Sequence, residues 1–252
     1  MQEVRAPQNE IDPIFDEFGF EYATAGRIAD QSGLDRMNEI CRIKGRAGVG
    51  LLSALPVIDK RYGLPGLAED VDSGRWIEAD VKTPQGYTVT VVCVYVHAGN
   101  TDDPEKMKQK YRFLDTMLVR MGQLRDEAAH GGRQAVLCGD FNIAHTPLDI
   151  KNAKANEKHA GFLPEERAYV DKWLGELEFV DVMRSLCGDI QGPYTWWSQR
   201  GRAFDNNVGW RIDYQFATPE LAETARGFVI DKAPTYDLRW SDHAPLSITY
   251  DV

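Results

Sequence analysis

Short apolar runs with strand character recur along the first part of the chain. Segments rich in β-branched and apolar residues predict strands over residues 47–53 (AGVGLLS), 76–81 (WIEADV) and 87–96 (YTVTVVCVYV). Turn signals such as PQG separate them. A further apolar run at 134–141 (QAVLCGDF) has the same character. The pattern therefore predicts a series of buried or half-buried strands.

Helical spacing occupies two longer segments. From Pro104 to about Ala129 apolar residues recur three and four positions apart, and HGG ends the pattern. A second helix is predicted over 164–177 (PEERAYVDKWLGEL), where proline stands in the first turn with acidic residues behind it. After it, short strands are predicted over 194–198, 211–217, 227–230 and 245–252.

The order of these elements predicts an α/β fold with layered sheets and outer helices, because strands follow one another in pairs with helices between them. We find no internal repeat, low-complexity tract or linker, so one domain over residues 1–252 is predicted. A chain with 43% hydrophobic residues can fill such a domain. No apolar run is long enough to span a membrane and the N-terminus lacks a signal-peptide layout, so we expect a soluble, cytoplasmic protein.

The charge distribution leaves the class of partner open. A formal net charge of −10 argues against a polyanionic partner, because phosphate binding draws on Lys and Arg. Local distribution matters more, however, although each basic cluster alone is more often a solvated face. Basic residues gather at 42–46, 106–112, 151–158 and 200–202.

The cysteine spacing argues against a zinc site or a disulfide framework. No two cysteines form a CxxC pair, and two of them stand in strand-like runs. We therefore expect reduced, structural thiols at Cys41, Cys93, Cys138 and Cys187.

The stretch VLCGDFNIAHTPLDIKN, residues 136–152, places Asp140 and Asn142 where an apolar run stops. If the run is a buried strand, alternation brings both side chains to one face at its C-terminal end. A carboxylate that accepts a proton from water and an amide that holds a phosphate oxygen need such a placement. A strand-end turn, in which both residues serve loop hydrogen bonds, explains the pair equally well.

Two further segments carry candidate chemistry. Asp242 and His243 precede the last predicted strand, and histidine is the side chain best suited to titrate near neutral pH, although a surface histidine is the plainer interpretation. Asp213 interrupts an otherwise apolar strand within NVGWRIDYQFA, residues 207–217. Because a buried acid is costly without a partner, we expect Asp213 to pair with a histidine.

With their order and flanks, these motifs resemble the exonuclease III family of apurinic/apyrimidinic endonucleases, within the magnesium-dependent endonuclease, exonuclease and phosphatase group. The resemblance covers nearly the whole chain. GDFN and SDH recur across the larger group, whereas AGFLPEER and NVGWRIDY are more specific for the DNA-repair branch. The other matching segments are QE at 2–3, GVGLLS at 48–53, VYV at 94–96, GDFNIAH at 139–145, LDIKN at 148–152, YTWW at 194–197 and SDHAP at 241–245.

The resemblance implies a four-layer α/β sandwich, with two mixed β-sheets packed face to face and helices outside. It implies a monomeric base-excision-repair enzyme that hydrolyses the phosphodiester 5' to abasic sites, with 3'-5' exonuclease and 3'-repair activity. The partner would be double-stranded DNA with abasic or damaged 3' ends, and the enzyme would be nucleoid-associated in a bacterium. Two alternatives stay open: a phosphatase of the same fold acting on a small phosphoester, and a catalytically impaired DNA-binding remnant.

Carried over residue by residue, the resemblance implies a site for Mg²⁺, which Mn²⁺ can replace. Glu3 would bind the ion, and Asp242 is the adjoining acid. Asp140 would orient or deprotonate the attacking water. Asn142 would hold a phosphate oxygen.

The resemblance also implies roles around the phosphate and the sugar. Asp213 would fix His243, which contacts the phosphate in the transition state, and Tyr95 would reach toward the same phosphate. An aromatic pocket would accept the base-less sugar and exclude a normal nucleotide on size. Trp196 and Trp210 are implied as its walls, and Lys151, Asn152 and Arg202 as further substrate contacts.

The chain departs from the family pattern in two places. The family continues VYV with Pro-Asn-Gly, whereas His97, Ala98 and Gly99 follow here, so a phosphate-binding asparagine is absent unless Asn100 replaces it. The family also places a strand with an Asn-Val-Asn-Gly type motif and a helix before QE. Since this chain starts at Met1, we expect that strand and helix to be missing, through a start assigned too far downstream or a real truncation.

Overall fold

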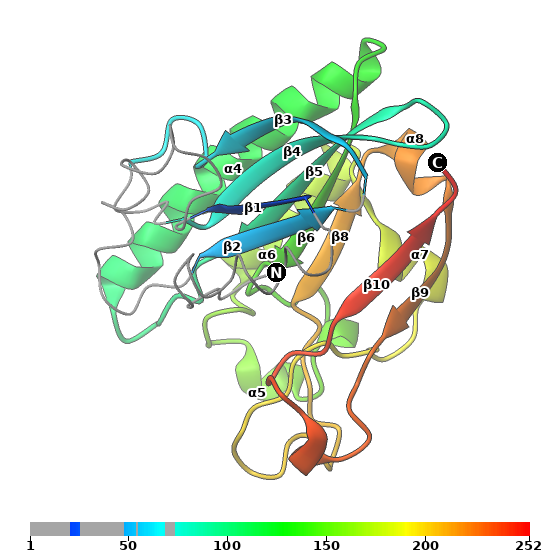
Figure 1. Cartoon of the computed structure of the whole chain (residues 1–252). Helices are drawn as coiled ribbons and strands as arrows, with labels where there is room; N and C mark the ends of the chain where they lie inside the picture. Colours follow the sequence, from blue (N-terminus) through cyan, green and yellow to red (C-terminus); the bar gives the residue numbers. More distant parts are fainter. Residues whose placement is uncertain (1–20, 26–47, 54, 69–73) are drawn as a thin grey trace. The chain divides into compact units, whose positions relative to one another are not determined.

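The computed structural model describes residues 21–25, 48–53, 55–68 and 74–252, with only the backbone described for the first of these segments (Figure 1). The described strands form one six-stranded sheet and two two-stranded sheets. With helices between the strands the fold is mixed α/β, as predicted. The face-to-face packing of two sheets stays a prediction.

The chain divides into two compact units. The first unit holds the described residues up to Val96 together with 112–139 and Val252. The second unit holds 97–111 and 140–251. We describe each unit by itself, and the prediction of a single domain stays a prediction.

Antiparallel strands form the frame of the first unit. β3 (Val57–Tyr62), β4 (Trp76–Lys82) and β5 (Thr88–Tyr95) follow one another, each paired antiparallel with the next. β1 (Glu21–Ala25) pairs antiparallel with β2 (Val49–Ser53). The predicted strands over 47–53, 76–81 and 87–96 are therefore confirmed.

Strand β4 is buried on both faces. Ile77, Ala79 and Val81 join one hydrophobic cluster with residues of β2. Because side chains alternate along a strand, Glu78 and Asp80 lie on the opposite face, where arginine side chains meet them. This alternation explains how one short strand buries both apolar and charged residues.

Helix α4 (Pro104–Ala129) has the bounds that its periodicity predicts. In the first unit, Arg120 of this helix contacts Glu78 of β4. Strand β6 (Gln134–Asp140) follows. A Cβ atom on Gly139 would lie only 1.9 Å from the carbonyl oxygen of Val94, so glycine is required where β6 passes β5.

The second unit combines short helices with two strand pairs. β7 pairs antiparallel with β8, and β9 pairs antiparallel with β10, which lies beside it in Figure 1. The rings of Phe141, Trp173, Tyr214 and Phe216 pack against one another in its core. Its elements are η1 (Pro147–Asp149), α5 (Ala153–Asn156), α6 (Pro164–Gly175), β7 (Val180–Asp181), α7 (Val182–Cys187), β8 (Asp213–Ala217), α8 (Pro219–Ala222), β9 (Ala225–Ile230), η2 (Tyr236–Leu238) and β10 (Leu246–Tyr250).

The predicted strand over 194–198 is wrong. Trp196 makes only isolated bridges, one with Trp210 and one with His243. The backbone N–H groups of Ile212 and Asp213 donate to the side-chain hydroxyl of Thr195 instead of entering a regular ladder. Periodicity alone cannot reveal such a side-chain acceptor.

Two other expectations concern the chain as a whole. Within the described residues, no helix is long and apolar enough to cross a membrane. Cys93, Cys138 and Cys187 are free thiols, as expected. Cys41 lies outside the described residues.

Candidate active site

The turn after β6 brings Asp140 and Asn142 into contact by a route other than strand alternation. The strand ends at Asp140, and Asn142 adopts a φ of 50°, so the predicted shared strand face is wrong. Asparagine tolerates this left-handed conformation because its short side chain can bond locally. Here the backbone N–H of Asn142 donates to Oδ1 of Asp140 (2.8 Å), and its Nδ2 donates to Oδ2 (2.9 Å).

Asp213 and His243 form the second part of the site. The backbone N–H of Phe141 donates to the carbonyl oxygen of Ile212 (2.9 Å), which places the start of β8 beside the turn. His243 Nδ1 lies 2.9 Å from Oδ2 and 3.1 Å from Oδ1 of Asp213. Its Nε2 lies 3.9 Å from Oδ2 of Asp140. One imidazole thus stands between two carboxylates whose side chains are at most 12% exposed.

Burial and mutual charge move the proton affinities of these groups. Burial raises the pKa of Asp140, the negative charge of Asp213 raises it further, and the opposing effect of His243 leaves it at about 8. Burial lowers the pKa of His243, but the charge of Asp213 and its hydrogen bond outweigh burial and raise the pKa to about 9. At neutral pH the imidazole is therefore a cation with both ring nitrogens acting as donors.

Two tryptophans adjoin this cluster. Trp196 donates its indole N–H to Oδ2 of Asp242 (3.0 Å). Its ring stands perpendicular to that of Trp210, with 6.1 Å between the ring centroids. Both rings are half-buried against an apolar cluster that includes Ile150 and Ile212. The second unit therefore places an apolar wall next to the acids.

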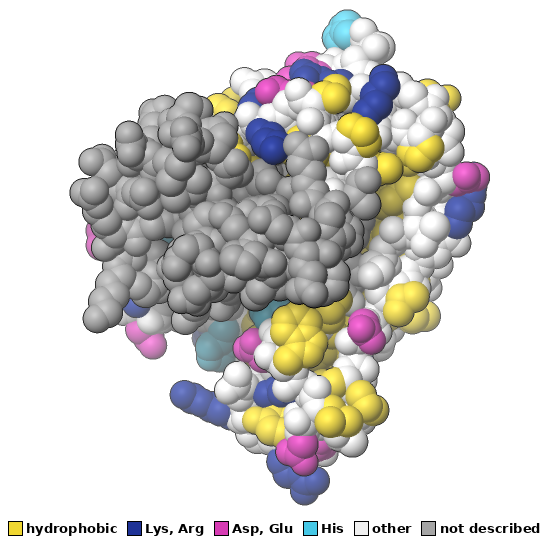
Figure 2. Space-filling view, viewed as in Figure 1, with side chains coloured by type: hydrophobic (Ala, Val, Ile, Leu, Met, Phe, Trp, Pro, Cys, Tyr) yellow, Lys and Arg dark blue, Asp and Glu magenta, His cyan; other side chains and the backbone are white. Residues whose placement is uncertain are grey.

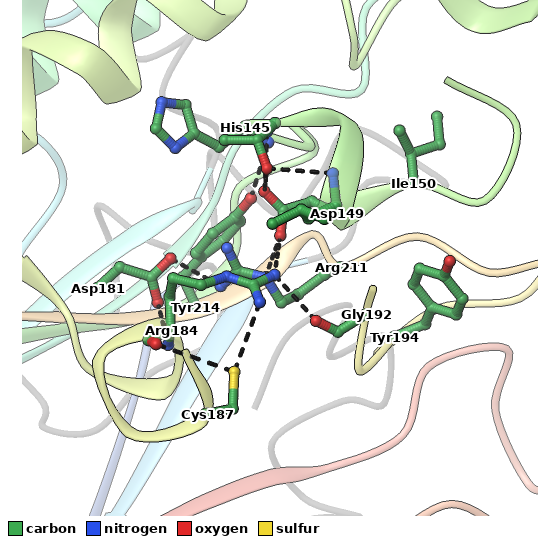
Figure 3. A network of polar contacts seen from close by, with 12 residues as sticks. His145, Asp149, Ile150, Asp181, Arg184, Cys187, Gly192, Tyr194, Arg211 and Tyr214 are labelled. Carbon is green, nitrogen blue, oxygen red and sulfur yellow. Dashed lines mark hydrogen bonds and ion pairs between the residues drawn. The ribbon is translucent and has the colours of Figure 1, made fainter. Parts of the chain in front are cut away.

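A buried ionic network, which the sequence did not predict, supports this wall (Figure 3). The carboxylate of Asp149 accepts hydrogen bonds from Nε of Arg211 (2.7 Å) and Nη2 of Arg184 (2.5 Å). The backbone N–H of Arg211 also donates to the backbone carbonyl oxygen of Asp149. Burial raises the pKa of Asp149, but the arginine charges outweigh it and hold the pKa below its ordinary value. The network ties the segment before Lys151 to the residue that follows Trp210.

The predicted substrate-contact residues lie on exposed loops of the second unit. The backbone N–H of Lys151 donates to the carbonyl oxygen of Gly209 (3.1 Å). Asn152 precedes α5 and accepts a hydrogen bond from Nδ2 of Asn156 on its carbonyl oxygen. The side chain of Arg202 is 81% exposed and pairs with Asp205 at 3.3 Å.

Of the remaining predicted residues, one lies in the first unit, one in a local turn and one outside the described residues. Tyr95 ends β5 in the first unit, where the guanidinium of Arg75 stacks 4.4 Å from its ring centroid. Asn100 accepts the backbone N–H of Asp102 on Oδ1, a local turn contact. Glu3 lies outside the described residues.

The donor set of the site fits a hard divalent cation. Within the residues that the structure describes, no group of three or more His, Cys, Asp or Glu side chains is arranged to hold a metal ion. Mg²⁺ usually binds through one or two carboxylates and keeps its waters, and Asp140 and Asp242 offer such oxygens. The raised pKa of Asp140 also shows that His243 compensates its buried charge incompletely.

The chain is similar to known nucleases and phosphatases in sequence and in fold. Residues 1–243 match the family described as Endonuclease/Exonuclease/phosphatase family. An exodeoxyribonuclease of Bacillus subtilis (strain 168) is 32% identical over 209 residues, which is 83% of this chain and 76% of that protein. An AP endonuclease from Archaeoglobus fulgidus matches 100% of this chain and 88% of its own, with a TM-score of 0.81 and 29% identity. A 3' phosphatase from Neisseria, bound to a product DNA hairpin, matches 100% of this chain and 87% of its own (TM-score 0.80, 26% identity).

Proposed function

The chain belongs to the endonuclease/exonuclease/phosphatase family, and on this premise we propose that it is a DNA-repair nuclease of the AP endonuclease and exonuclease III type. The proposed reaction is Mg²⁺-dependent hydrolysis of the phosphodiester 5' to an abasic site, with 3'-5' exonuclease and 3'-repair activity. The observation that carries the proposal is His243, held between the two buried carboxylates beside two perpendicular tryptophans.

Asp140 is the proposed base for the attacking water. A general base works best when its pKa lies near the working pH, and burial beside Asp213 brings the pKa of Asp140 to about 8. Asn142 keeps this carboxylate oriented through two hydrogen bonds. The same amide group is proposed to hold a phosphate oxygen.

His243 is proposed to stabilise the phosphate charge that grows during attack. Its pKa of about 9 keeps it protonated at neutral pH, so it donates Nδ1–H to Asp213 and presents Nε2–H on the side of Asp140. A fixed cation in a partly buried site stabilises such charge more than water does. No covalent intermediate is needed.

Mg²⁺, when bound, would add electrostatic stabilisation of the charge on the phosphate and on the departing 3' oxygen. Asp140 and Asp242 are the carboxylates of the second unit that would hold it, and Glu3 is proposed as a further ligand. Tyr95 is proposed as a phosphate contact.

Trp196 and Trp210 are proposed as walls for a base-less sugar. A flipped-out sugar without its base fits an apolar pocket that a full nucleotide would overfill. Basic, acidic and apolar side chains lie next to one another at the lower end of the view in Figure 2. Lys151, Asn152 and Arg202 lie on loops of the second unit and are proposed to contact the DNA backbone.

The decisive experiment uses a duplex that contains one abasic-site analogue. We expect cleavage on its 5' side, which leaves a 3' hydroxyl, in Mg²⁺ but not in chelator. The undamaged duplex and Asp140→Asn serve as controls. Hydrolysis of a small phosphoester without DNA cleavage would instead identify a phosphatase, and DNA binding without any cleavage would identify an inactive DNA-binding protein.

A further inference from the structure

A fully buried ion pair, which the proposed mechanism does not use, lies beside the active-site turn. Lys110 of α4 and Glu166 of α6 both have side chains that are 0% exposed, and Nζ lies 2.5 Å from Oε1. Both residues belong to the second unit. Burying two charges is expensive, and an apolar pair of similar volume is often as stable. The charges therefore call for an explanation other than stability.

Lys110 uses its remaining donors on two loops. Its Nζ donates to the carbonyl oxygen of Asn142 (2.9 Å) and to that of Ala98 (3.1 Å). An ammonium group has three donors, and Glu166 takes the third direction. Lys110 thus fixes the backbone of the residue whose side chain orients Asp140.

Glu166 fixes a third loop. Its Oε2 accepts the backbone N–H groups of Gly161 (2.6 Å) and Leu163 (3.0 Å). The carbonyl oxygen of Gly161 in turn accepts the N–H of Ala144 (2.8 Å). The carboxylate therefore holds the AGFL segment against the chain that leaves the active-site turn.

The loop that Glu166 holds packs directly against Trp210, one of the proposed walls for the base-less sugar. A Cβ atom added to Gly161 would lie 3.1 Å from Cζ3 of Trp210 and 3.2 Å from the carbonyl oxygen of Asn142. Gly99, next to Ala98, has a φ of 75°. A Cβ atom added to Gly99 would lie 3.1 Å from Cδ of Lys110. The segments around the ion pair are therefore packed too closely to shift independently.

We propose that Lys110 and Glu166 are a positioning pair, which sets the backbone of Asn142 and the pocket wall at Trp210 for phosphodiester cleavage. An apolar pair would fill the same space but would leave two carbonyl oxygens and two N–H groups without directed partners. The inference rests on the proposed nuclease function for its kinetic consequence. Its structural consequence can be measured without any substrate.

The test is the neutral double variant Lys110→Met, Glu166→Gln, which removes both charges without stranding either one. We expect kcat on the abasic duplex to fall by about 100-fold, because small displacements of positioned groups cost rate of this order. The Kd for undamaged duplex should stay unchanged, since the buried pair cannot reach DNA. Amide hydrogen exchange in segments 139–145 and 160–163 should become faster by roughly tenfold.

The matched control is Glu78→Gln, Arg120→Met, which neutralises a buried ion pair of the first unit. It should lower the free energy of unfolding at least as much as Lys110→Met, Glu166→Gln does. It should leave kcat and hydrogen exchange in segments 139–145 and 160–163 unchanged. Equal loss of kcat in the control would overturn the inference, as would unchanged kcat in a folded Lys110→Met, Glu166→Gln protein. If that variant does not fold, Glu166→Gln alone should show the same changes at smaller size, and its unchanged exchange would also overturn the inference.

The outcomes for the two proposals are distinguishable. A wild-type protein that cleaves no DNA contradicts the nuclease proposal, whereas the exchange measurement still decides whether the pair holds the two segments. A wild-type protein that cleaves the abasic duplex, with a double variant that cleaves equally well, contradicts only the positioning role.

Discussion

Each unit of the chain buries a pair of carboxylates, and the two pairs differ in how much positive charge meets them. In the first unit Arg120 binds Glu78 through Nε and Nη2, at 2.7 and 2.8 Å. Arg61 and Arg133 both contact Asp80. Burial raises the pKa values of Glu78 and Asp80, but the arginines outweigh burial and hold both pKa values below the ordinary range.

In the second unit the balance is reversed. Asp140 and Asp213 share a single histidine as their nearest cation. Burial and the neighbouring charge therefore raise the pKa of Asp140 to about 8, and His243 is raised to about 9. Full compensation keeps a buried acid ionised and inert, whereas partial compensation gives it a proton affinity near neutral pH. That difference distinguishes a structural charge cluster from a candidate active site.

The largest expected effect comes from Asp140→Asn. Loss of the proposed base should lower kcat on the abasic duplex by about 10³-fold or more, given the usual range for acid–base and electrostatic groups. The variant should fold normally, because Asp140 binds a proton in the folded state up to about pH 8, so at neutral pH the amide replaces a group that is already mostly uncharged. Single-turnover cleavage and a thermal melt of the same sample test both statements. An unfolded Asp140→Asn protein would contradict the comparison.

Glu78→Gln should behave in the opposite way. It removes the more buried of the two carboxylates that pair with Arg120, and breaking a buried pair typically costs about 3 to 5 kcal/mol of unfolding free energy. Cleavage per folded molecule should be unchanged at a temperature where the variant is folded. Urea denaturation measures the loss, and a stability like that of wild type would show that Glu127 alone compensates the charge of Arg120.

The pH dependence of stability should show both clusters in metal-free buffer. The depressed pKa values of Glu78 and Asp80 contribute stability above the pKa of an unfolded acid, near 4. This contribution is lost as pH falls. Asp140 binds a proton in the folded state up to about pH 8, and His243 up to about pH 9, whereas unfolded Asp and His lose theirs near 4 and 6.5.

The folded state of the second cluster thus holds more protons than the unfolded chain, so its contribution to stability declines as pH rises from about 4 toward 9. Chemical denaturation in the presence of chelator across this range measures the unfolding free energy on the acid limb, where stability is lost as pH falls, and on the alkaline limb, where it declines as pH rises. Asp140→Asn should remove part of the alkaline decline and leave the acid limb intact. A decline that is identical in the variant would assign it to other groups.

Mg²⁺ should stabilise the protein through the carboxylates of the second unit and not through Glu78 and Asp80. A ligand at about 100 times its Kd raises the unfolding free energy by about 2.7 kcal/mol. The increase should be seen in wild type and in Glu78→Gln, and it should be largely lost in Asp140→Asn. Melting curves with Mg²⁺ and with chelator measure it, and equal stabilisation of all three proteins would place the ion elsewhere.

The sequence predicted elements with strong periodicity and motifs with rare composition. Helix α4 and strands β4 and β5 came from apolar spacing, since packing on one face imposes it. Strand β3 (VIDKRY) was missed because its charged residues reach into the arginine cluster or solvent. Among the site residues, Asp213 could be singled out because it interrupts an otherwise apolar strand, whereas the roles of Asp140 and His243 came from the resemblance to a known family.

The supporting interactions could not be predicted, because they join residues that are distant in sequence. Asp149 and Arg211 are 62 positions apart, and Lys110 and Asn142 are 32 apart. Nothing in the local pattern of either partner specifies the other. The turn at Asn142 was only one of two interpretations that the sequence allowed, since a positive φ at asparagine leaves no mark on hydrophobic periodicity.

The smallest expected effect separates exposed arginines from the buried ones. The arginines of the first cluster are committed to carboxylates, whereas the side chain of Arg202 is 81% exposed and proposed to meet DNA phosphate. Arg202→Ala should weaken DNA binding modestly and reduce the slope of log K against log salt by about 1, since one phosphate contact is lost. Arg226→Ala is the matched control, because that exposed arginine of the same unit also pairs with an aspartate, Asp251. Fluorescence anisotropy across a salt series measures both, and equal slopes in the two variants would mean that Arg202 is only a solvated surface charge.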